Sequence, residues 1–393
     1  MIEPAGPEFV SIRMPFERMN VSSLFTNSWY GHGVKTVVRS VTAEVLTDAR
    51  SVESEWAELA ERIGGRFSAR PTYALRELGD SRGSTRIVVA RRGGSLVGVI
   101  PLAVRRLGAF DLARLAGSGR GIPQQFLCED EHVAEALWET VARRGWVFYA
   151  SSLAERDPGF GVLERDPGFV TNSTTVETAP CISVPRGVTA KDLRSRRTRK
   201  RLRQYRNSLA AAGAPLSYET ISGIDHFDRR WSDMARVAEA STSLHRRLNY
   251  LAAPDGSFAH DFLRDETAAG RAVVVGLVVD GRWCAHEIAL RSGNRLEAWL
   301  GHYDPGFSRW QPGHQLSEWF VDNHDLLDVT ELDQGIGVNA IKSAWSNSST
   351  NLNRVVAVPS RYRAPGLVTD AVIAWEGSTA IRRLRRLGGT LLA

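Results

Sequence analysis

The chain has 393 residues, of which 43% are hydrophobic and 24% are charged, values close to those of an average globular protein. They exclude a disordered chain, a collagen-like repeat and a coiled coil, and the length allows two or three domains. The longest apolar run, residues 272–279, is too short for a membrane-spanning helix, which needs about 20 residues.

Cysteine and histidine usage indicates a reducing compartment and no metal. The three cysteines, Cys128, Cys181 and Cys284, are far apart and odd in number, which argues against a disulfide framework and against a zinc site. The nine histidines are scattered without the spacing of metal ligands. The first residues have no apolar stretch typical of a secretory signal. We expect a cytoplasmic protein, with a peripheral position at a membrane as the open alternative.

Positive charge is concentrated in one segment. Lys and Arg number 50 against 44 Asp and Glu, a net charge of +6. Residues 191–206 contribute +8 of this, so the rest of the chain carries −2. The excess of basic residues is therefore local, and by itself it does not indicate a nucleic-acid-binding protein.

Regular elements begin near residue 41. Apolar spacing predicts a helix at 51–63, and β-rich runs on both sides of Gly93-Gly94 predict a hairpin. Residues 129–144 form an amphipathic pattern, and a short strand is expected at 146–150. Residues 1–40 lack this periodicity, so we expect an irregular extension there.

The second half repeats this order. The expected elements are helices at 225–240 and 259–269, strands at 271–279, 283–291 and 295–303 with a hairpin turn at Asp280-Gly281, a loop at 304–313, a helix at 314–327, and strands at 329–333 and 351–358. The two halves thus predict an α+β protein with two copies of one unit, each a mixed, mostly antiparallel sheet flanked by helices.

Domain boundaries follow from this repeat. The expected parts are an extension at 1–40, an N-terminal domain at 41–178, a C-terminal domain at 179–365 and a basic tail at 366–393. The sequence Glu-Arg-Asp-Pro-Gly-Phe occurs twice between the halves, at 155–160 and 164–169. Because Asp-Pro-Gly favours turns, we interpret residues 155–185 as a surface connection.

The loop before the helix at 314–327 is a candidate anion site. Three antiparallel strands lead through this loop and helix to a strand parallel to the third, so these two strands should part beside the helix N-terminus. Free N–H groups and partial positive charge there suit a diphosphate. Gly313 allows close approach, Pro312 costs no hydrogen bond in the first turn, and Arg309 adds charge. An ordinary strand-to-helix connection is the alternative.

This arrangement resembles the GNAT acyltransferases, most of all their cellulose-biosynthesis-type (CelD-like) branch, which is related to the Fem peptidyltransferases. The resemblance covers about residues 41–359. It is carried by the hairpin at Asp280-Gly281, residues 303–307 and 312–316, the apolar run 179–184, the basic helix at 193–209, and Asp333, Gly335, Ile341, Lys342 and Trp345. Ile341 stands where that branch often has Tyr.

The resemblance implies tandem GNAT-like domains with a catalytic C-terminal copy and a degenerate N-terminal copy that is structural or shapes the cleft. The implied activity is an N-acyltransferase that moves an acyl group from acyl-CoA, acetyl or longer, to an amine of a small molecule or peptide. The cofactor-binding candidates are Arg309, Gln311, Gly313, His314 and Gln315.

Amine acylation also needs a base for the amine, an N–H donor for the carbonyl oxygen and an acid for the leaving thiolate. Neighbours on a strand point to opposite faces, so only one of His286 and Glu287, and one of His302 and Tyr303, can face the cleft. We expect Glu287 as the base and Tyr303 or His302 as the acid. Alternatively, these residues face solvent or cap the sheet edge. The candidates for binding the acceptor are His286, Asp333, Lys342 and Trp345.

Three interpretations of the basic segment 191–206 stay open. It is a solvated face, or a surface that attracts the CoA phosphates, an acidic acceptor or a carrier protein, or a surface for tRNA or lipid. The short basic stretch 380–387 favours the lipid interpretation weakly. The alternative functions are a Fem-like transferase that uses aminoacyl-tRNA and a non-catalytic binding module built on residues 191–206.

Overall fold

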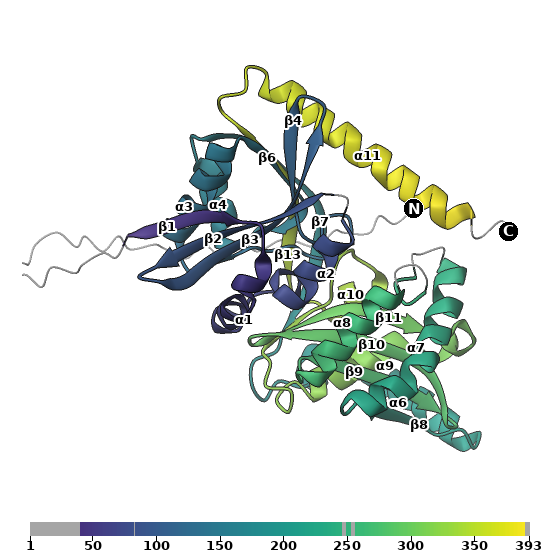
Figure 1. Cartoon of the computed structure of the whole chain (residues 1–393). Helices are drawn as coiled ribbons and strands as arrows, with labels where there is room; N and C mark the ends of the chain where they lie inside the picture. The colour runs from purple at the N-terminus through teal and green to yellow at the C-terminus, as the bar shows by residue number, and fades with distance from the viewer. Residues whose placement is uncertain (1–39, 82, 246–248, 253–255, 390–393) are drawn as a thin grey trace, which may run out of the picture. The chain divides into compact units, whose positions relative to one another are not determined.

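The computed structural model describes residues 40–81, 83–245, 249–252 and 256–389 (Figure 1). Their thirteen strands form one sheet, in the order β1-β2-β3-β4-β6-β13-β7-β12-β11-β10-β9-β8, with β5 paired to β3. Helices flank this sheet, so the expected α+β class is confirmed. The predicted irregular extension lies, except for Ser40, outside the described residues.

The predicted elements of the first half occur in the expected order, together with further strands and helices that the sequence did not predict. Its elements are β1 (Val41–Leu46), η1 (Ala49–Ser51), α1 (Glu53–Arg62), η2 (Phe67–Ala69), α2 (Pro71–Gly79), β2 (Ser84–Arg92), β3 (Ser95–Leu107), β4 (Phe110–Leu115), β5 (Leu127–Cys128), α3 (Glu131–Arg144), β6 (Trp146–Ala154), α4 (Pro158–Arg165) and β7 (Phe169–Ser183). Local chemistry sets the ends of α3: the Asp130 side chain accepts from the Val133 amide, and Gly145 ends the helix at a φ of 71°.

The second half runs to the last described residue. Its elements are α5 (Ala190–Leu193), α6 (Arg196–Ala211), β8 (Leu216–Thr220), α7 (Ile224–His245), α8 (Gly256–Ala268), β9 (Ala272–Val279), β10 (Arg282–Ser292), β11 (Arg295–Tyr303), η3 (Pro305–Trp310), α9 (Pro312–Asp322), β12 (Glu331–Asp333), α10 (Ala340–Trp345), β13 (Ser348–Pro359) and α11 (Pro365–Gly389). The turn between β9 and β10 has positive φ at both Asp280 and Gly281, as a tight two-residue hairpin requires.

The repeat is visible in the pairing of strands. In the first half β1 to β4 pair antiparallel and β4 pairs parallel with β6. In the second half β8 to β11 pair antiparallel and β11 pairs parallel with β12. The last strand of each half is exchanged: β13 pairs with β6, β7 pairs with β12, and β7 and β13 pair with each other. Each half therefore completes its sheet with a strand of the other.

This exchange corrects the expected surface connection at residues 155–185. The first Asp-Pro-Gly starts α4, where Asp157 accepts from the Gly159 amide, and the second leads into β7, a central strand of 15 residues. Much of β7 is polar and exposed, so it lacks the apolar alternation of a buried strand. The predicted boundary at 178/179 falls within β7, and the division into domains stays a prediction.

Two further elements differ from expectation. The helix expected at 314–327 starts earlier, at Pro312, and ends at Asp322. The expected basic tail begins as α11 (Figure 1), and its Val372 is buried in one cluster with residues of β4, β6 and β13. The side chains of residues 380–387 lie outside the described ones. In the described part of the chain, no helix combines the length and apolar composition that crossing a bilayer requires.

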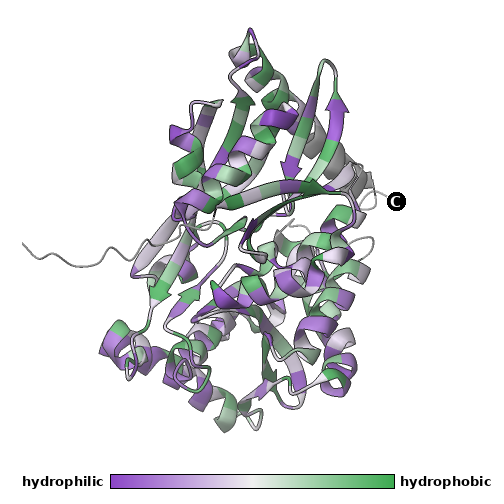
Figure 2. Cartoon of the chain, turned by 60° about the vertical axis from the view of Figure 1, so that its left-hand side comes forward, coloured by the Kyte–Doolittle hydropathy of each residue, from purple (hydrophilic) through white to green (hydrophobic). Residues whose placement is uncertain are grey.

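Apolar layers cover both faces of the β8–β11 sheet, and hydrophobic and hydrophilic residues mix along the strands of the chain in the hydropathy view (Figure 2). On one face β10 and β11 pack against α6 and α9. On the other face they pack against α7, α8 and residues of the first half, including Phe67, Tyr73 and Ile122. Side chains on alternate positions of β10 and β11 therefore enter two different environments.

Candidate active site

The candidate site lies where β11 and β12 part. These strands pair only at Arg295↔Glu331, Leu296↔Leu332 and Glu297↔Asp333. Beyond Glu297, β11 continues to Tyr303 paired with β10 alone. The pairing with β10 skips Trp299, which forms a β-bulge at the point of divergence. The parting of the strands that the element order predicted is present, and it leaves residues 298–301 without a partner in β12.

An open cleft of about 700 Å³ runs through this gap and is lined by both halves of the chain. The second half contributes β10, β11, α9 and residues 332–342. The first half contributes Phe67 and residues 121–123. From the sequence we expected a cleft beside β11 and a first half that is structural or shapes this cleft.

Glu287 on β10 is one of the carboxylates that line this cleft. It pairs across the ladder with Gly301, and a Cβ on Gly301 would lie only 2.4 Å from Glu287 Oε2. The glycine therefore makes room for the carboxylate. Burial raises the pKa of Glu287 to about 7, although the positive charge of Lys342 acts to lower it. A carboxylate with this pKa can exchange a proton near neutral pH.

His286 and His302 lie on the opposite face. The indole N–H of Trp283 donates to His286 Nδ1 (3.4 Å), and His286 Nε2 lies 3.2 Å from His302 Nδ1. Burial and the neighbouring His302 hold the pKa of His286 well below its usual range. Because neutral His286 accepts at Nδ1, it carries its proton on Nε2 and donates to His302. His302 Nδ1 is the acceptor of this hydrogen bond.

Tyr303 lies on the same face as Glu287. It is paired with Ala285 and packs with the apolar layer against α6 and α9. As predicted from strand geometry, neighbours separate: Glu287 and Tyr303 share one face, while His286 and His302 share the other. All four line the cleft, because the cleft passes through the gap and reaches both faces.

The N-terminus of α9 differs from the candidate anion site that the sequence predicted there. The amides of His314 and Gln315 both bond to the carbonyl of Gln311. A Cβ on Gly313 would lie 2.7 Å from Cδ1 of Ile341, so that side chain occupies the space expected for a closely approaching anion. A side chain at position 313 would displace the end of Ile341. Of the five predicted cofactor residues only Gly313 lines the cleft.

The other predicted cofactor residues have different surroundings. Arg309 is exposed and stacks on Trp310, 3.9 Å from the ring centroid to its Cζ. Gln311 adopts a left-handed backbone before α9. Gln315 is buried and accepts from Arg206 of α6. His314 Nδ1 accepts from Trp345 Nε1 (3.0 Å). Their roles in cofactor binding stay predictions.

The predicted acceptor residues Asp333 and Lys342 both hold the loop after β12. Asp333 Oδ1 accepts from the Gly335 amide (2.8 Å), and Lys342 Nζ donates to the carbonyls of Gly335 (3.2 Å) and Ile336 (2.8 Å). Both residues line the cleft, whereas Trp345 does not. Sequence reasoning missed Gly301; a glycine inside the predicted strand 295–303 was the available signal.

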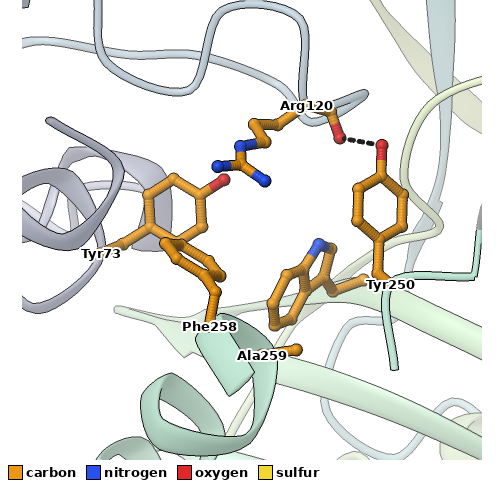
Figure 3. A pocket seen from close by; sticks show the side chains of 6 residues that line it. Tyr73, Arg120, Tyr250, Phe258 and Ala259 are labelled. Carbon is orange, nitrogen blue, oxygen red and sulfur yellow. Dashed lines mark hydrogen bonds between the residues drawn. The ribbon is translucent and has the colours of Figure 1, made fainter. Parts of the chain in front are cut away.

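A very small void is surrounded by a cluster of side chains that we call the aromatic joint (Figure 3). Its residues are Tyr73, Arg120, Tyr250, Phe258, Ala259 and Trp299. The Tyr250 hydroxyl donates to the Arg120 carbonyl (2.9 Å), and the Arg120 guanidinium lies 5.0 Å from the Phe258 ring centroid. Tyr250 and Trp299 line both this joint and the cleft. The void in the joint is only about 10 Å³, about the space of one water. It therefore supports the cleft wall and does not admit a substrate.

Residues 196–343 match the family profile of the acetyltransferase (GNAT) domain. The chain contains a GNAT domain. The match spans α6 to α10 and includes β11, β12 and the cleft between them, so the resemblance to the GNAT superfamily is confirmed, and the chain is a transferase enzyme. No match was found among curated proteins.

Solved structures show the same fold. FemX superimposes with a TM-score of 0.58 at 10% identity, covering 79% of this chain and 96% of FemX. The C-terminal DUF2156 domain of a putative lysylphosphatidylglycerol synthetase from Agrobacterium fabrum gives 0.53 at 12% identity, over 84% of this chain and 96% of that one. A conserved protein of unknown function from Bacteroides thetaiotaomicron gives 0.51 at 9% identity, over 80% and 99%. The GNAT domain thus has a Fem-related fold.

Proposed function

We propose that the chain is an N-acyltransferase that moves an acyl group from acyl-CoA to an amine. The observation that carries this proposal is the gap between β11 and β12, through which a cleft of about 700 Å³ reaches both faces of the sheet. An extended thioester arm fits such a gap, because main-chain groups of residues 298–301, which have no partner in β12, border it.

The roles of the side chains follow from their positions. The amine nitrogen attacks the thioester carbon, and Glu287 takes the amine proton, directly or through a water. Main-chain N–H groups of residues 298–301, beyond the pairing with β12, stabilise the developing oxyanion. The carbon–sulfur bond breaks, and the thiolate receives a proton from Tyr303 or His302.

Calorimetry with acetyl-CoA and longer acyl-CoAs tests the donor. We expect saturable binding and, with an amine acceptor, release of one free thiol for each acylated amine. Detection of co-purifying CoA by mass spectrometry would give independent support. Absence of binding to every acyl-CoA tested would overturn the proposal.

A Fem-like transferase that uses aminoacyl-tRNA is the second candidate. The favouring observation is α6, where Arg196, Arg197, Lys200 and Arg203 are all exposed. Within the described part of the chain, none of the four has an ion pair. Arg side chains suit phosphate groups. Loss of activity on ribonuclease treatment, with indifference to acyl-CoA, would favour this candidate over the first.

A further inference from the structure

A buried charge cluster joins the first half to the base of the gap. Arg66 lies between α1 and η2, and its Nη1 is 2.6 Å from Glu297 Oε2 and 2.8 Å from Asp333 Oδ2. The side chains of Arg66, Glu297 and Asp333 are 5%, 3% and 1% exposed. Glu297 and Asp333 are the last paired residues of β11 and β12. One guanidinium nitrogen thus bridges the two strands at the point where they begin to part.

Every carboxylate oxygen of this cluster has a partner. Glu297 Oε1 accepts from the Phe67 amide (3.1 Å) and from the Ser292 hydroxyl. Asp333 Oδ1 accepts from the Gly335 amide, which starts the loop that lines the cleft. Arg66 is itself held by its amide, which donates to Gln125 Oε1 (2.7 Å). A complete network of this kind fixes geometry, because any displacement leaves a buried charge without a partner.

We propose that Arg66 is a positioning residue that sets the separation of β11 and β12 from the first half of the chain. Arg66 does not reach the reacting atoms; it acts through Glu297 and Asp333. Through Arg66 the first half of the chain takes part in shaping the gap between β11 and β12. This inference rests on the proposed function only where kinetics are used to test it.

A neighbouring ion pair offers a matched control. Arg70 belongs to the same segment and is equally buried, and its Nη1 lies 3.2 Å from Glu266 of α8. It also joins the two halves, but Glu266 does not line the cleft. Removal of this pair should cost stability without altering the gap.

The test compares two neutralised clusters. The triple variant Arg66→Met, Glu297→Gln, Asp333→Asn removes the bridge without leaving a buried charge, and the double variant Arg70→Met, Glu266→Gln is the control. Hydrogen exchange is followed at the amides of residues 298–303 and 334–337, together with KM for acetyl-CoA and the thermal midpoint. The single variant Arg66→Lys keeps both carboxylates and retains one charged donor group in the cluster.

We expect exchange at both segments to accelerate about tenfold in the triple variant and to stay unchanged there in the control. In the triple variant KM for acetyl-CoA should rise about tenfold or more. The single variant Arg66→Lys should show only a small part of this rise. Equal exchange at these segments in both variants would overturn the inference, whatever the thermal midpoints. If the wild type does not use acyl-CoA, the proposed donor fails, while the exchange measurement still decides the role of Arg66.

Discussion

Glu287 shows how neighbours set both the position and the protonation of one side chain. Its carboxylate occupies the space left by Gly301 and lines the cleft, and burial raises its pKa to about 7. A base has to be deprotonated to act, and the raised pKa lies close to neutral pH. Small changes around this residue should therefore alter the rate in the physiological range.

For Glu287→Gln we expect kcat/KM to fall about 10²- to 10⁴-fold, since an amide cannot accept the amine proton. In the wild type, activity should be lost as the pH falls through about 7, because the carboxylate becomes protonated. Initial rates between pH 5.5 and 9, with an acceptor of constant ionisation, would be about tenfold lower per unit below the pKa.

The control for this prediction is Glu331→Gln on β12, which does not line the cleft. This variant should keep the wild-type rate and pH profile. If the Glu287→Gln enzyme keeps the wild-type kcat/KM and still loses activity as the pH falls through about 7, another group accepts the proton.

Gly301→Ala tests the position of the carboxylate separately from its charge. The added Cβ would lie 2.4 Å from Glu287 Oε2, so the carboxylate has to move, whereas the β11 backbone can stay in place. We expect kcat/KM to fall about 10²-fold, as for a displacement of about 1 Å, with a small change in the thermal midpoint. Glu287→Asp combined with Gly301→Ala should recover part of the rate, because a shorter side chain avoids the clash. Unchanged kinetics in Gly301→Ala would argue against Glu287 as the base.

At the scale of elements, sequence patterns sufficed where the determinants are local. The bounds of β11 and the hairpin at Asp280-Gly281 were predictable from alternation and turn chemistry, and the parting of β11 and β12 followed from element order. β7 was missed because its polar, Thr-rich sequence resembles a connection. The position of Ile341 over Gly313 was not readable either, since it depends on how α10 packs against α9.

Long-range charge contacts were also beyond the sequence. Arg66 is 231 residues from Glu297 and 267 residues from Asp333. Nothing in the local pattern around Arg66 distinguishes it from a surface arginine. Its burial is tolerated only because the tertiary fold brings two carboxylates to it. The two carboxylate partners of Arg66 are therefore brought to it only when both halves of the chain have folded together.

The basic helix α6 allows a prediction at its own scale. Replacement of Arg196, Arg197, Lys200 and Arg203 by Ala should leave the thermal midpoint nearly unchanged, because all four side chains are exposed. Arg199 is kept, since its Nε donates to the Arg194 carbonyl. With acyl-CoA as donor we expect kcat/KM to change by less than about threefold, as for surface charges outside a site. With aminoacyl-tRNA, affinity would fall strongly and its salt dependence would weaken.

At the scale of the whole described chain, the exchange of β7 and β13 makes each half depend on the other. β13 lies between β6 and β7, and β7 lies between β13 and β12. The cluster around Arg66 and the pair of Arg70 with Glu266 add buried charge contacts between the halves. The second half therefore cannot be separated from the first half by cutting at a domain boundary, as two adjacent but independent domains could.

Division of the chain at residues 186/187, in the exposed turn after β7, tests this dependence. Residues 40–186 alone lack β13 and leave β6 and β7 with unpaired edges, while residues 187–389 lack β7 beside β12. Because exposed edges promote aggregation, we expect neither fragment to remain monomeric and to unfold cooperatively by itself. Co-expressed fragments should co-purify and recover the gap, as judged by hydrogen exchange at residues 298–303. A synthetic peptide of residues 348–359 should increase the soluble fraction of 40–186, whereas a scrambled peptide should not. A cooperatively folded fragment 187–389 would show that the exchanged strands are dispensable and that the second half is an independent domain.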